Sequence, residues 1–151
     1  MAKIHYISTK PLSFERIEEI LEGGYQLALS TESVRAIENC RNYLDEKIKN
    51  HTAPLYGITT GFGSLCNKSI SKSELGQLQK NLVMSHACGM GPVVPKDIVL
   101  LMLFLKIQSI SYGYSGVQLK TVERLGALFN RNIYPVVYEQ GSLGASGDLA
   151  P

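Results

Sequence analysis

Apolar residues recur every three or four positions along most of the chain, and this period predicts amphipathic α-helices. The expected helices lie over 14–22, from about 31 to about 50, from about 71 to 88, after Pro95, and around 119–129. Ser13 can cap the first of them, and Gly23 and Gly24 can end it because glycine accepts left-handed geometry. The pattern therefore predicts a mainly α protein.

Three of these helices carry an apolar stripe along one face. The stripes consist of Val34, Ile37, Leu44 and Ile48 in the second helix, of Leu75, Leu78 and Leu82 in the third, and of Leu119, Val122, Leu125 and Phe129 in the fifth. Pro54 prevents the second helix from continuing. Ser71 and Glu74 have the spacing of a capping box, in which each side chain accepts a hydrogen bond from the other residue's backbone amide.

The helix after Pro95 contains the apolar run Ile98–Leu105, which is interrupted by Lys106. Because this helix is apolar nearly all round, we expect it in the middle of a helical bundle. The run is much shorter than the roughly 20 residues that a membrane span requires, so we expect no membrane association.

Two glycine-rich segments break the helical pattern, Tyr56–Gly63 and Gly141–Pro151. A short extended piece over Ile133–Tyr138 leads into the second of them. Functional residues gather on loops that a rigid scaffold positions, so these two segments are where function is expected.

Composition and charge narrow the function classes. The 151 residues are 44% hydrophobic and 19% charged, with a formal net charge of +2. The 15 lysine and arginine residues are spread along the chain, which argues against binding nucleic acid. The chain shows no signal-peptide pattern, and its three cysteines have no disulfide-scaffold spacing. We expect a cytoplasmic protein with reduced thiols.

The segment Gly141–Pro151 fails three common glycine-rich motifs. A phosphate-binding P-loop needs a lysine after its last glycine, whereas Asp148 follows Gly147. Its glycines stand three apart, which does not match the dinucleotide fingerprint. A nucleophile elbow needs a glycine where Asp148 stands.

Residue by residue, the sequence Gly141-Ser-Leu-Gly-Ala-Ser-Gly-Asp-Leu-Ala-Pro151 is similar to the signature of the histidine and phenylalanine ammonia-lyase family. Gly144 and Ala150 resemble the histidine-specific members. The resemblance implies that Ala145, Ser146 and Gly147 cyclise to a 4-methylideneimidazol-5-one ring, with Asp148 assisting.

The residue types suit that cyclisation. Gly147 has no side chain to obstruct attack of its nitrogen on the carbonyl carbon of Ala145, and the hydroxyl of Ser146 can leave as water. Loss of two waters would give an electrophile made from the chain itself, with no external cofactor. An ordinary glycine-rich turn is the alternative.

The segment Tyr56-Gly-Ile-Thr-Thr-Gly-Phe-Gly63 resembles the tyrosine loop of the same family, and Tyr56 falls on its catalytic tyrosine. Removal of a weakly acidic β-proton requires a strong base, which a tyrosinate supplies. Thr59 departs from the asparagine that histidine-specific members commonly have. A core or rim aromatic residue is the alternative for Tyr56.

The segment Asn81–Gly89 resembles the substrate-selecting helix end of the family. His86 follows Leu75 by about three helical turns, so it continues the apolar stripe and is expected to point inward. By the resemblance, an imidazole here hydrogen-bonds the ring of the substrate. A hydrogen-bonded core histidine is the alternative.

Other histidines and cysteines carry no separate prediction of function. His86, Cys88 and the distant Cys66 lack the paired spacing of a zinc site, so no metal is expected. His5 and His51 are expected at the surface, near the ends of segments.

Taken together, the resemblance implies the N-terminal part of the helical-bundle ammonia-lyase fold, with glycine-rich active-site loops. The implied reaction eliminates ammonia from the small-molecule substrate L-histidine to give trans-urocanate. Residues 1–151 are interpreted as the N-terminal portion of such an enzyme, ending inside the signature at Pro151. The family assembles its active sites from several subunits of a homotetramer, so the 151-residue piece alone is expected to be inactive.

Two other functions stay open. The first is a tyrosine or phenylalanine ammonia-lyase, or an aminomutase, of the same family. The second belongs to another class: a non-catalytic helical or phosphate-binding module whose glycines serve only to form turns.

Overall fold

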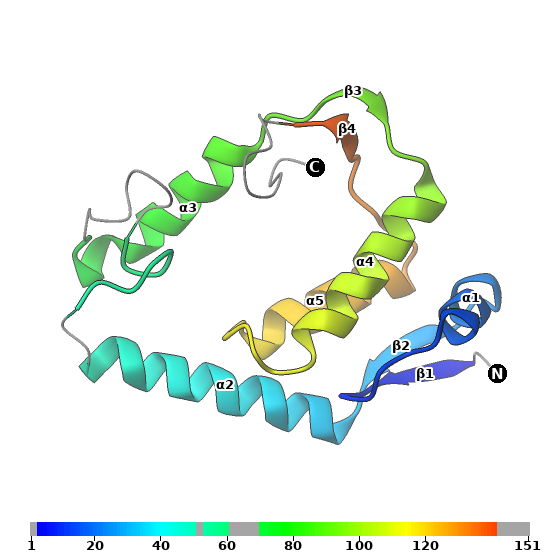
Figure 1. Ribbon diagram of the computed structural model, residues 1–151, viewed down its shortest axis with the longest axis horizontal. Helices are drawn as coiled ribbons and strands as arrows, with labels where there is room; N and C mark the ends of the chain where they lie inside the picture. Colours follow the sequence, from blue (N-terminus) through cyan, green and yellow to red (C-terminus); the bar gives the residue numbers. More distant parts are fainter. Residues whose placement is uncertain (1–2, 51–52, 61–69, 142–151) are drawn as a thin grey trace. The chain divides into compact units, whose positions relative to one another are not determined.

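The computed structural model describes residues 3–50, 53–60 and 70–141, and the chain divides into two compact units. The first unit consists of the described residues of 1–50 and 95–136. The second consists of the described residues of 51–94 and 137–151. Figure 1 labels the helices and strands of both.

The first unit combines a two-stranded parallel sheet with four helices. Its elements in chain order are β1 (Ile4–Ile7), α1 (Phe14–Glu22), β2 (Gln26–Leu29), α2 (Thr31–Asn50), α4 (Lys96–Ile110) and α5 (Leu119–Asn130). Strands β1 and β2 pair from Ile4↔Gln26 to Ile7↔Leu29, with α1 as the connection between them (Figure 1). The apolar core consists of Ile7, Ile20, Leu27, Ile37, Phe104, Ile107 and Val122.

The predicted helices α1, α2 and α5 are confirmed. Helix α1 begins where expected, and the Ser13 hydroxyl accepts a hydrogen bond from the Arg16 amide at 3.3 Å. It ends at Gly23, and Gly24 adopts a left-handed φ of 63°. In α2 the predicted stripe is the inner face, because Ile37 is buried and Val34, Leu44 and Ile48 are half-buried.

The strands β1 and β2 were not expected from the sequence. Each has only four residues, and burial alternates along β1, with Ile4 and Tyr6 exposed and His5 and Ile7 buried. An alternation over four positions is too short to be separated from the surrounding helical pattern. Parallel pairing adds a further difficulty, because the partner strand lies beyond a helix.

Helix α4, which we expect in the middle of a helical bundle, is partly buried and partly exposed among the described residues. Val99, Phe104 and Ile107 are buried, whereas Ile98, Met102 and Leu105 are 43%, 42% and 41% exposed. The described part of the first unit thus covers one face of this helix. Apolar residues all round allow burial on every side, but burial also needs neighbouring elements.

His5 corrects the expectation of a surface histidine. It lies on β1 with 8% of its surface exposed and contacts the edge of Phe104, with ring centroids 6.2 Å apart. Its Nδ1 is 3.4 Å from a guanidinium nitrogen of Arg16, and its Nε2 has no hydrogen-bond partner among the described residues. Burial and the positive charge of Arg16 lower the pKa of His5, while Glu19 opposes this shift.

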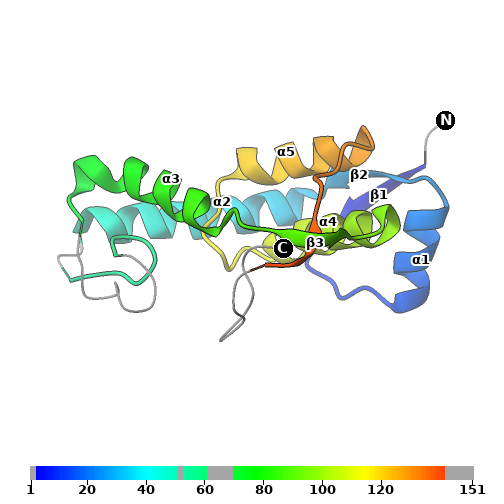
Figure 2. The same cartoon turned by 90° about the horizontal axis from the view of Figure 1, so that it is seen from above.

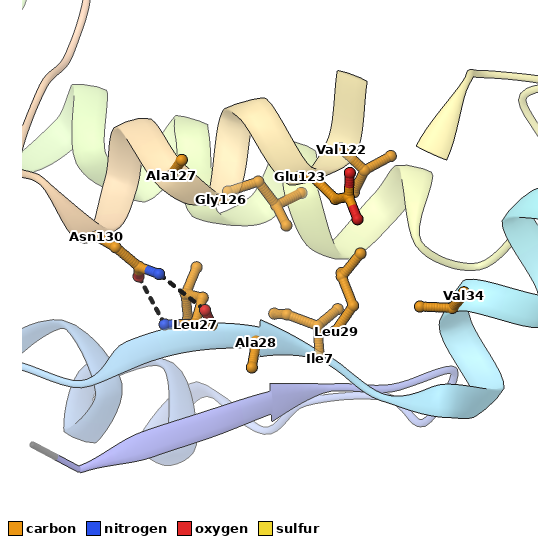
Figure 3. A pocket seen from close by; sticks show the side chains of 11 residues that line it. Ile7, Leu27, Ala28, Leu29, Val34, Val122, Glu123, Gly126, Ala127 and Asn130 are labelled. Atoms are coloured by element: carbon orange, nitrogen blue, oxygen red, sulfur yellow. Dashed lines mark hydrogen bonds between the residues drawn. The ribbon is translucent and has the colours of Figure 1, made fainter. Parts of the chain in front are cut away.

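Asn130 joins the end of α5 to the edge of β2. Its carboxamide accepts from the Leu27 amide at 2.7 Å and donates to the Leu27 carbonyl at 2.9 Å (Figure 3). The Gln26 and Ser30 amides donate to the carbonyls of Lys3 and Ile7, so the backbone groups of Leu27 face away from β1. The Asn130 side chain therefore takes the place of a third strand at this position.

Gly113 allows the connection between α4 and α5 to pass close to α2. Its φ is 78°, and a Cβ atom added there would lie 2.6 Å from the backbone carbon and oxygen of Ala36. Only glycine tolerates both conditions, since other residues strain at positive φ and would also clash.

The second unit contains a short 3-10 helix, one α-helix and an antiparallel strand pair. These are η2 (Lys72–Glu74), α3 (Leu75–His86), β3 (Met90–Val93) and β4 (Tyr138–Gln140). Figure 1 and Figure 2 both show β3 beside β4, and the pairing joins Met90 to Gln140 and Val93 to Tyr138. The extended piece expected over Ile133–Tyr138 becomes a strand only from Tyr138 onward.

The capping box expected at Ser71 and Glu74 has a different geometry. The Ser71 hydroxyl donates to the Glu74 carboxylate at 2.6 Å, and no cap bond from the Ser71 side chain to the backbone forms. The intervening turn is a 3-10 helix, in which the Glu74 amide bonds to the Ser71 carbonyl at 3.0 Å. The two side chains therefore satisfy each other directly.

Among the described residues, no helix is both long enough and apolar enough to cross a membrane.

The close approach at Gly113 yields a stability prediction. Gly113→Ala should lower the free energy of unfolding by about 2–4 kcal/mol, because it combines a positive φ with a backbone clash. Gly126→Ala is the matched control: Gly126 lies inside α5 with nothing within 4 Å of an added Cβ, so alanine should stabilise by about 0.5–1 kcal/mol. Urea denaturation measures both, and equal effects would contradict the described close approach.

The buried His5 yields a pH prediction. Its folded-state pKa lies below the unfolded value of about 6.5, so the unfolded state binds the proton more readily. The contribution of neutral His5 to the free energy of unfolding is therefore fully present above pH 6.5. It is lost as the pH falls through the lower pKa of the folded state. Urea denaturation at pH 7.5 and 5.5 should show a larger loss for the wild type than for His5→Phe. Equal losses would show that His5 does not titrate on unfolding.

Candidate functional site

Of the three segments that the sequence singles out, the structure describes residues 56–60 of the first, the backbone of the second, and Gly141 alone of the third. Tyr56 and His86 are described, and both belong to the second unit. Ala145, Ser146, Gly147 and Asp148 lie outside the described residues, as do Cys66 and His51.

Tyr56 lies on a turn that two threonine hydroxyls hold in place. The Thr59 hydroxyl accepts from the Leu55 amide at 2.8 Å, and the Thr60 hydroxyl accepts from the Gly57 amide at 3.2 Å. Thr60 is completely buried, which anchors the turn. Gly57 has a φ of 68°, a conformation that favours glycine. The glycine and both threonines that follow Tyr56 thus have a structural reason to be there.

The Tyr56 side chain is 63% exposed, which is inconsistent with a core aromatic residue. The turn is also tied to its surroundings, because the Gln79 side chain of α3 donates to the Gly57 carbonyl at 3.4 Å. The Ile70 amide donates to the Thr59 carbonyl at 2.9 Å. The structure therefore holds the backbone around Tyr56 and leaves its side chain at the surface of the described residues.

His86 is the last residue of α3 and shares a face with the apolar stripe. Leu75, Leu78 and His86 are half-buried, whereas the other described side chains of this helix are exposed. The stripe is therefore confirmed for Leu75 and Leu78, and the side chain of Leu82 lies outside the described part. Full burial of His86 is not observed, so it is not a core histidine among these residues.

Hydrogen bonds hold the end of α3 at and beside His86. The Ser85 hydroxyl lies 3.1 Å from Nδ1 of the imidazole ring. The Cys88 amide donates to the His86 carbonyl at 2.9 Å, and the Ala87 amide donates to the Met84 carbonyl at 3.4 Å. The helix thus ends in an ordered turn that fixes the backbone of His86.

The pairing of β3 with β4 connects the His86 helix end to the start of the Gly141–Pro151 segment. Met90, four residues after His86, is paired with Gln140, which directly precedes Gly141. Gly89 packs against Tyr138, since an added Cβ would lie 3.0 Å from the tyrosine ring. Two of the three motifs are therefore joined by a short strand pair.

Sequence reasoning missed β3, for a physical reason. The strand contains Gly91 and Pro92, both of which are depleted in strands. Gly91 has a φ of 83° and lies against the side chain of Gln140. The register between the two strands is irregular at this place. Gly89 and Gly91 mark the end of α3 in the sequence, but they do not indicate a strand.

A pocket of about 360 Å³ lies in the first unit between β2 and α5 (Figure 3). Its lining is mostly apolar, Glu123 is its one acidic residue, and the Asn130 carboxamide is engaged with the backbone of Leu27. Within the described ranges, no group of three or more His, Cys, Asp or Glu residues could hold a metal ion. The pocket is lined mainly by apolar side chains, and we assign no catalytic role to it.

Fold and site together define a mainly helical protein in which the described candidate residues are Tyr56, on a turn, and His86, at the end of α3. The chain belongs to the aromatic amino acid lyase family, because the family model for aromatic amino acid lyases matches residues 12–151.

Similar proteins agree with this assignment. A histidine ammonia-lyase of Legionella pneumophila (strain Lens) is 46% identical over 140 residues, which are 93% of this chain and 28% of the relative. The crystal structure of histidine ammonia-lyase from Trypanosoma cruzi superimposes with a TM-score of 0.80 at 28% identity, over 98% of this chain and 28% of that one. Phenylalanine aminomutase of Pantoea agglomerans superimposes with a TM-score of 0.86 at 26% identity, over 99% of this chain and 29% of that one.

These comparisons confirm the expected fold, that of the ammonia-lyases and aminomutases. The chain spans less than a third of the length of the relatives it matches. The fold is shared by enzymes named for different substrates, so it does not by itself select one.

The contact between Gly89 and Tyr138 yields a prediction for the strand pair. Gly89→Ala should push the tyrosine ring aside and weaken the pairing of β3 with β4. Hydrogen exchange of the Val94 amide, which donates to the Val137 carbonyl at 2.9 Å, should become about tenfold faster. Gly76→Ala, in α3 with nothing within 4 Å of its added Cβ, should leave that exchange unchanged. Unchanged exchange in Gly89→Ala would exclude tight packing there.

Proposed function

We propose that the whole protein is an ammonia-lyase that converts L-histidine to trans-urocanate and ammonia. The observation that carries this proposal is the 46% identity with an enzyme named histidine ammonia-lyase, which extends over 93% of this chain. The 151 residues would correspond to the N-terminal portion of such an enzyme.

Ala145, Ser146 and Gly147 would form the 4-methylideneimidazol-5-one group. Their chemistry fits it: a glycine nitrogen attacks the uncrowded alanine carbonyl, the serine hydroxyl leaves, and two waters are lost in all. Asp148 would assist this cyclisation. The group supplies an electrophile that makes the amino group of the substrate a better leaving group.

Tyr56 would remove the β-proton of the substrate as general base. Its exposed side chain on an ordered turn supports this role, because a base must reach the substrate from a fixed backbone. His86 would hydrogen-bond the imidazole ring of the substrate and so orient it.

Thr59 does not oppose histidine as the substrate. Its hydroxyl serves the turn by accepting from the Leu55 amide. An asparagine side chain also offers an oxygen acceptor and can fill that role. The difference at this position therefore concerns how the turn is held.

The whole protein would be a homotetramer in the cytoplasm. The exposed apolar face of α4, with Ile98, Met102 and Leu105, supports further covering by the remainder of the chain or by other subunits. Cys40 and Cys88 are free thiols, which agrees with a reducing compartment.

A second candidate is an aminomutase or lyase that acts on phenylalanine or tyrosine. The fold leaves it open, because phenylalanine aminomutase of Pantoea agglomerans shares that fold with a TM-score of 0.86. An imidazole at position 86 can also hydrogen-bond a phenol hydroxyl.

The mature full-length protein tests the proposal by mass spectrometry and a substrate screen. Wild-type protein should be lighter than its sequence by two waters and should produce urocanate from histidine. Ser146→Ala should lack the mass loss and lose activity. Tyr56→Phe should keep the mass loss but lower kcat by about 10²–10⁴-fold, because only the base is removed. Tyr114→Phe, at a 91% exposed tyrosine of the first unit, should match the wild type.

Three results would decide against parts of this proposal. An unshifted mass with fully active Ser146→Ala would exclude the ring. Cinnamate, coumarate or a β-amino acid as the main product would favour the second candidate. A normal rate for Tyr56→Phe would remove Tyr56 as the base.

A further inference from the structure

Two peptide units meet at Tyr56, and hydrogen bonds hold both of them. The unit before it is fixed by the main chain, because the Leu55 carbonyl accepts from two amides later in the turn, at 3.0 Å and 2.9 Å. The unit after it is fixed by a side chain, because the Gly57 amide donates to the Thr60 hydroxyl at 3.2 Å. A backbone amide can only donate, so the direction of this second bond is settled.

Holding both peptide units fixes the direction of the Tyr56 side chain. Peptide units are planar, so the backbone between them can change only through the φ and ψ angles of Tyr56. When both planes are held, these two angles are set and the Cα–Cβ bond has one direction. The side chain then has only the few staggered positions that its χ1 angle allows. The phenol hydroxyl is therefore restricted to a small set of positions, although Tyr56 is 63% exposed.

Thr60 is suited to this task because it is completely buried. The carbonyl of Gly57 accepts from Gln79 of α3 at 3.4 Å, so this glycine is held at both of its polar groups. The Thr59 hydroxyl has a different place in the turn, since it accepts from the Leu55 amide at 2.8 Å. The same hydroxyl donates to the Leu55 carbonyl only at 3.5 Å, and that carbonyl is already held by main-chain amides. Thr60 is therefore the side chain that sets the second peptide unit.

We propose that Thr60 is a positioning residue for Tyr56: its buried hydroxyl holds the Gly57 amide and so fixes the direction in which the phenol leaves the turn. Thr60 acts through Tyr56 and does not itself bind the substrate. The effect on the reaction rests on the proposed function, in which Tyr56 is the base, whereas the anchoring of the backbone does not.

Hydrogen exchange at single amides of the full-length protein tests the anchor. In the wild type the Gly57 amide should be protected, because its acceptor is a buried hydroxyl. Thr60→Val keeps the shape of the side chain without the hydroxyl, so exchange at Gly57 should become about tenfold faster, while the Val94 amide of the same unit stays unchanged. Thr60→Ser keeps the hydroxyl and should retain the protection. Thr121→Val, at an exposed threonine of α5, is the control and should match the wild type.

Steady-state kinetics with L-histidine tests the effect on the reaction. Thr60→Val should lower kcat about 10–100-fold with little change in KM, because a displaced base reacts slowly while the substrate still binds. Thr60→Ser should recover most of the loss. In the Tyr56→Phe background, Thr60→Val should lower the residual rate no further, because the group that it positions is already absent. A purely structural defect would instead lower the rate by the same factor in both backgrounds.

Each part of the proposal has its own contrary result. An unprotected Gly57 amide in the wild type would overturn the anchor without any variant, as would unchanged exchange in Thr60→Val. Faster exchange at Val94 as well would show a general loss of structure and overturn the local role of the hydroxyl. Faster exchange at Gly57 with unchanged kcat, or a full further fall in the Tyr56→Phe background, would overturn the positioning role in the reaction. Absence of lyase activity in the wild type would count against the proposed function and leave the exchange result standing.

Discussion

The pairing of β3 with β4 is the constraint that joins the chain after the His86 helix to the residues just before Gly141. The chain leaves the second unit after Val94, forms α4 and α5 in the first unit, and returns at Val137. The Val94 amide donates a hydrogen bond to the Val137 carbonyl at 2.9 Å, so the two ends of this long connection are joined. Closing so long a loop costs conformational entropy, which the packing of the segment inside it must offset. The strand pair therefore depends on a helical segment that carries none of the proposed catalytic residues.

That helical segment is stabilised by the core of the first unit. Phe104 is fully buried, contacts His5 of β1 at its edge, and lies near Phe129 of α5 with ring centroids 6.1 Å apart. Asn130 then fixes the end of α5 to the edge of β2. His5 is a buried polar residue beside the apolar core, and the half-buried Asn130 satisfies backbone groups at the edge of β2.

The proposed site residues share one structural principle. Tyr56 lies on a turn and His86 at the end of α3; hydrogen bonds hold the backbone at both places, while the two side chains are exposed and half-buried, respectively. A rigid backbone with an accessible side chain suits groups that must meet a substrate in a fixed geometry. Polar neighbours such as Thr59 and Thr60 hold the backbone at Tyr56, and they give no signal in the apolar pattern of the sequence.

The sequence by itself determined the helices, the family and the identity of the candidate residues. Helical period and caps need only local information, as at Ser13 and Gly24, and the signature Gly141–Pro151 is contiguous. The tertiary structure alone decided the strands, the burial of His5 and the one-sided cover of α4. Each of these depends on partners distant along the chain: Ile4 pairs with Gln26, His5 packs on Phe104, and Met90 pairs with Gln140. Four-residue strands and single buried polar groups leave no periodic trace, because their stability comes from those distant contacts.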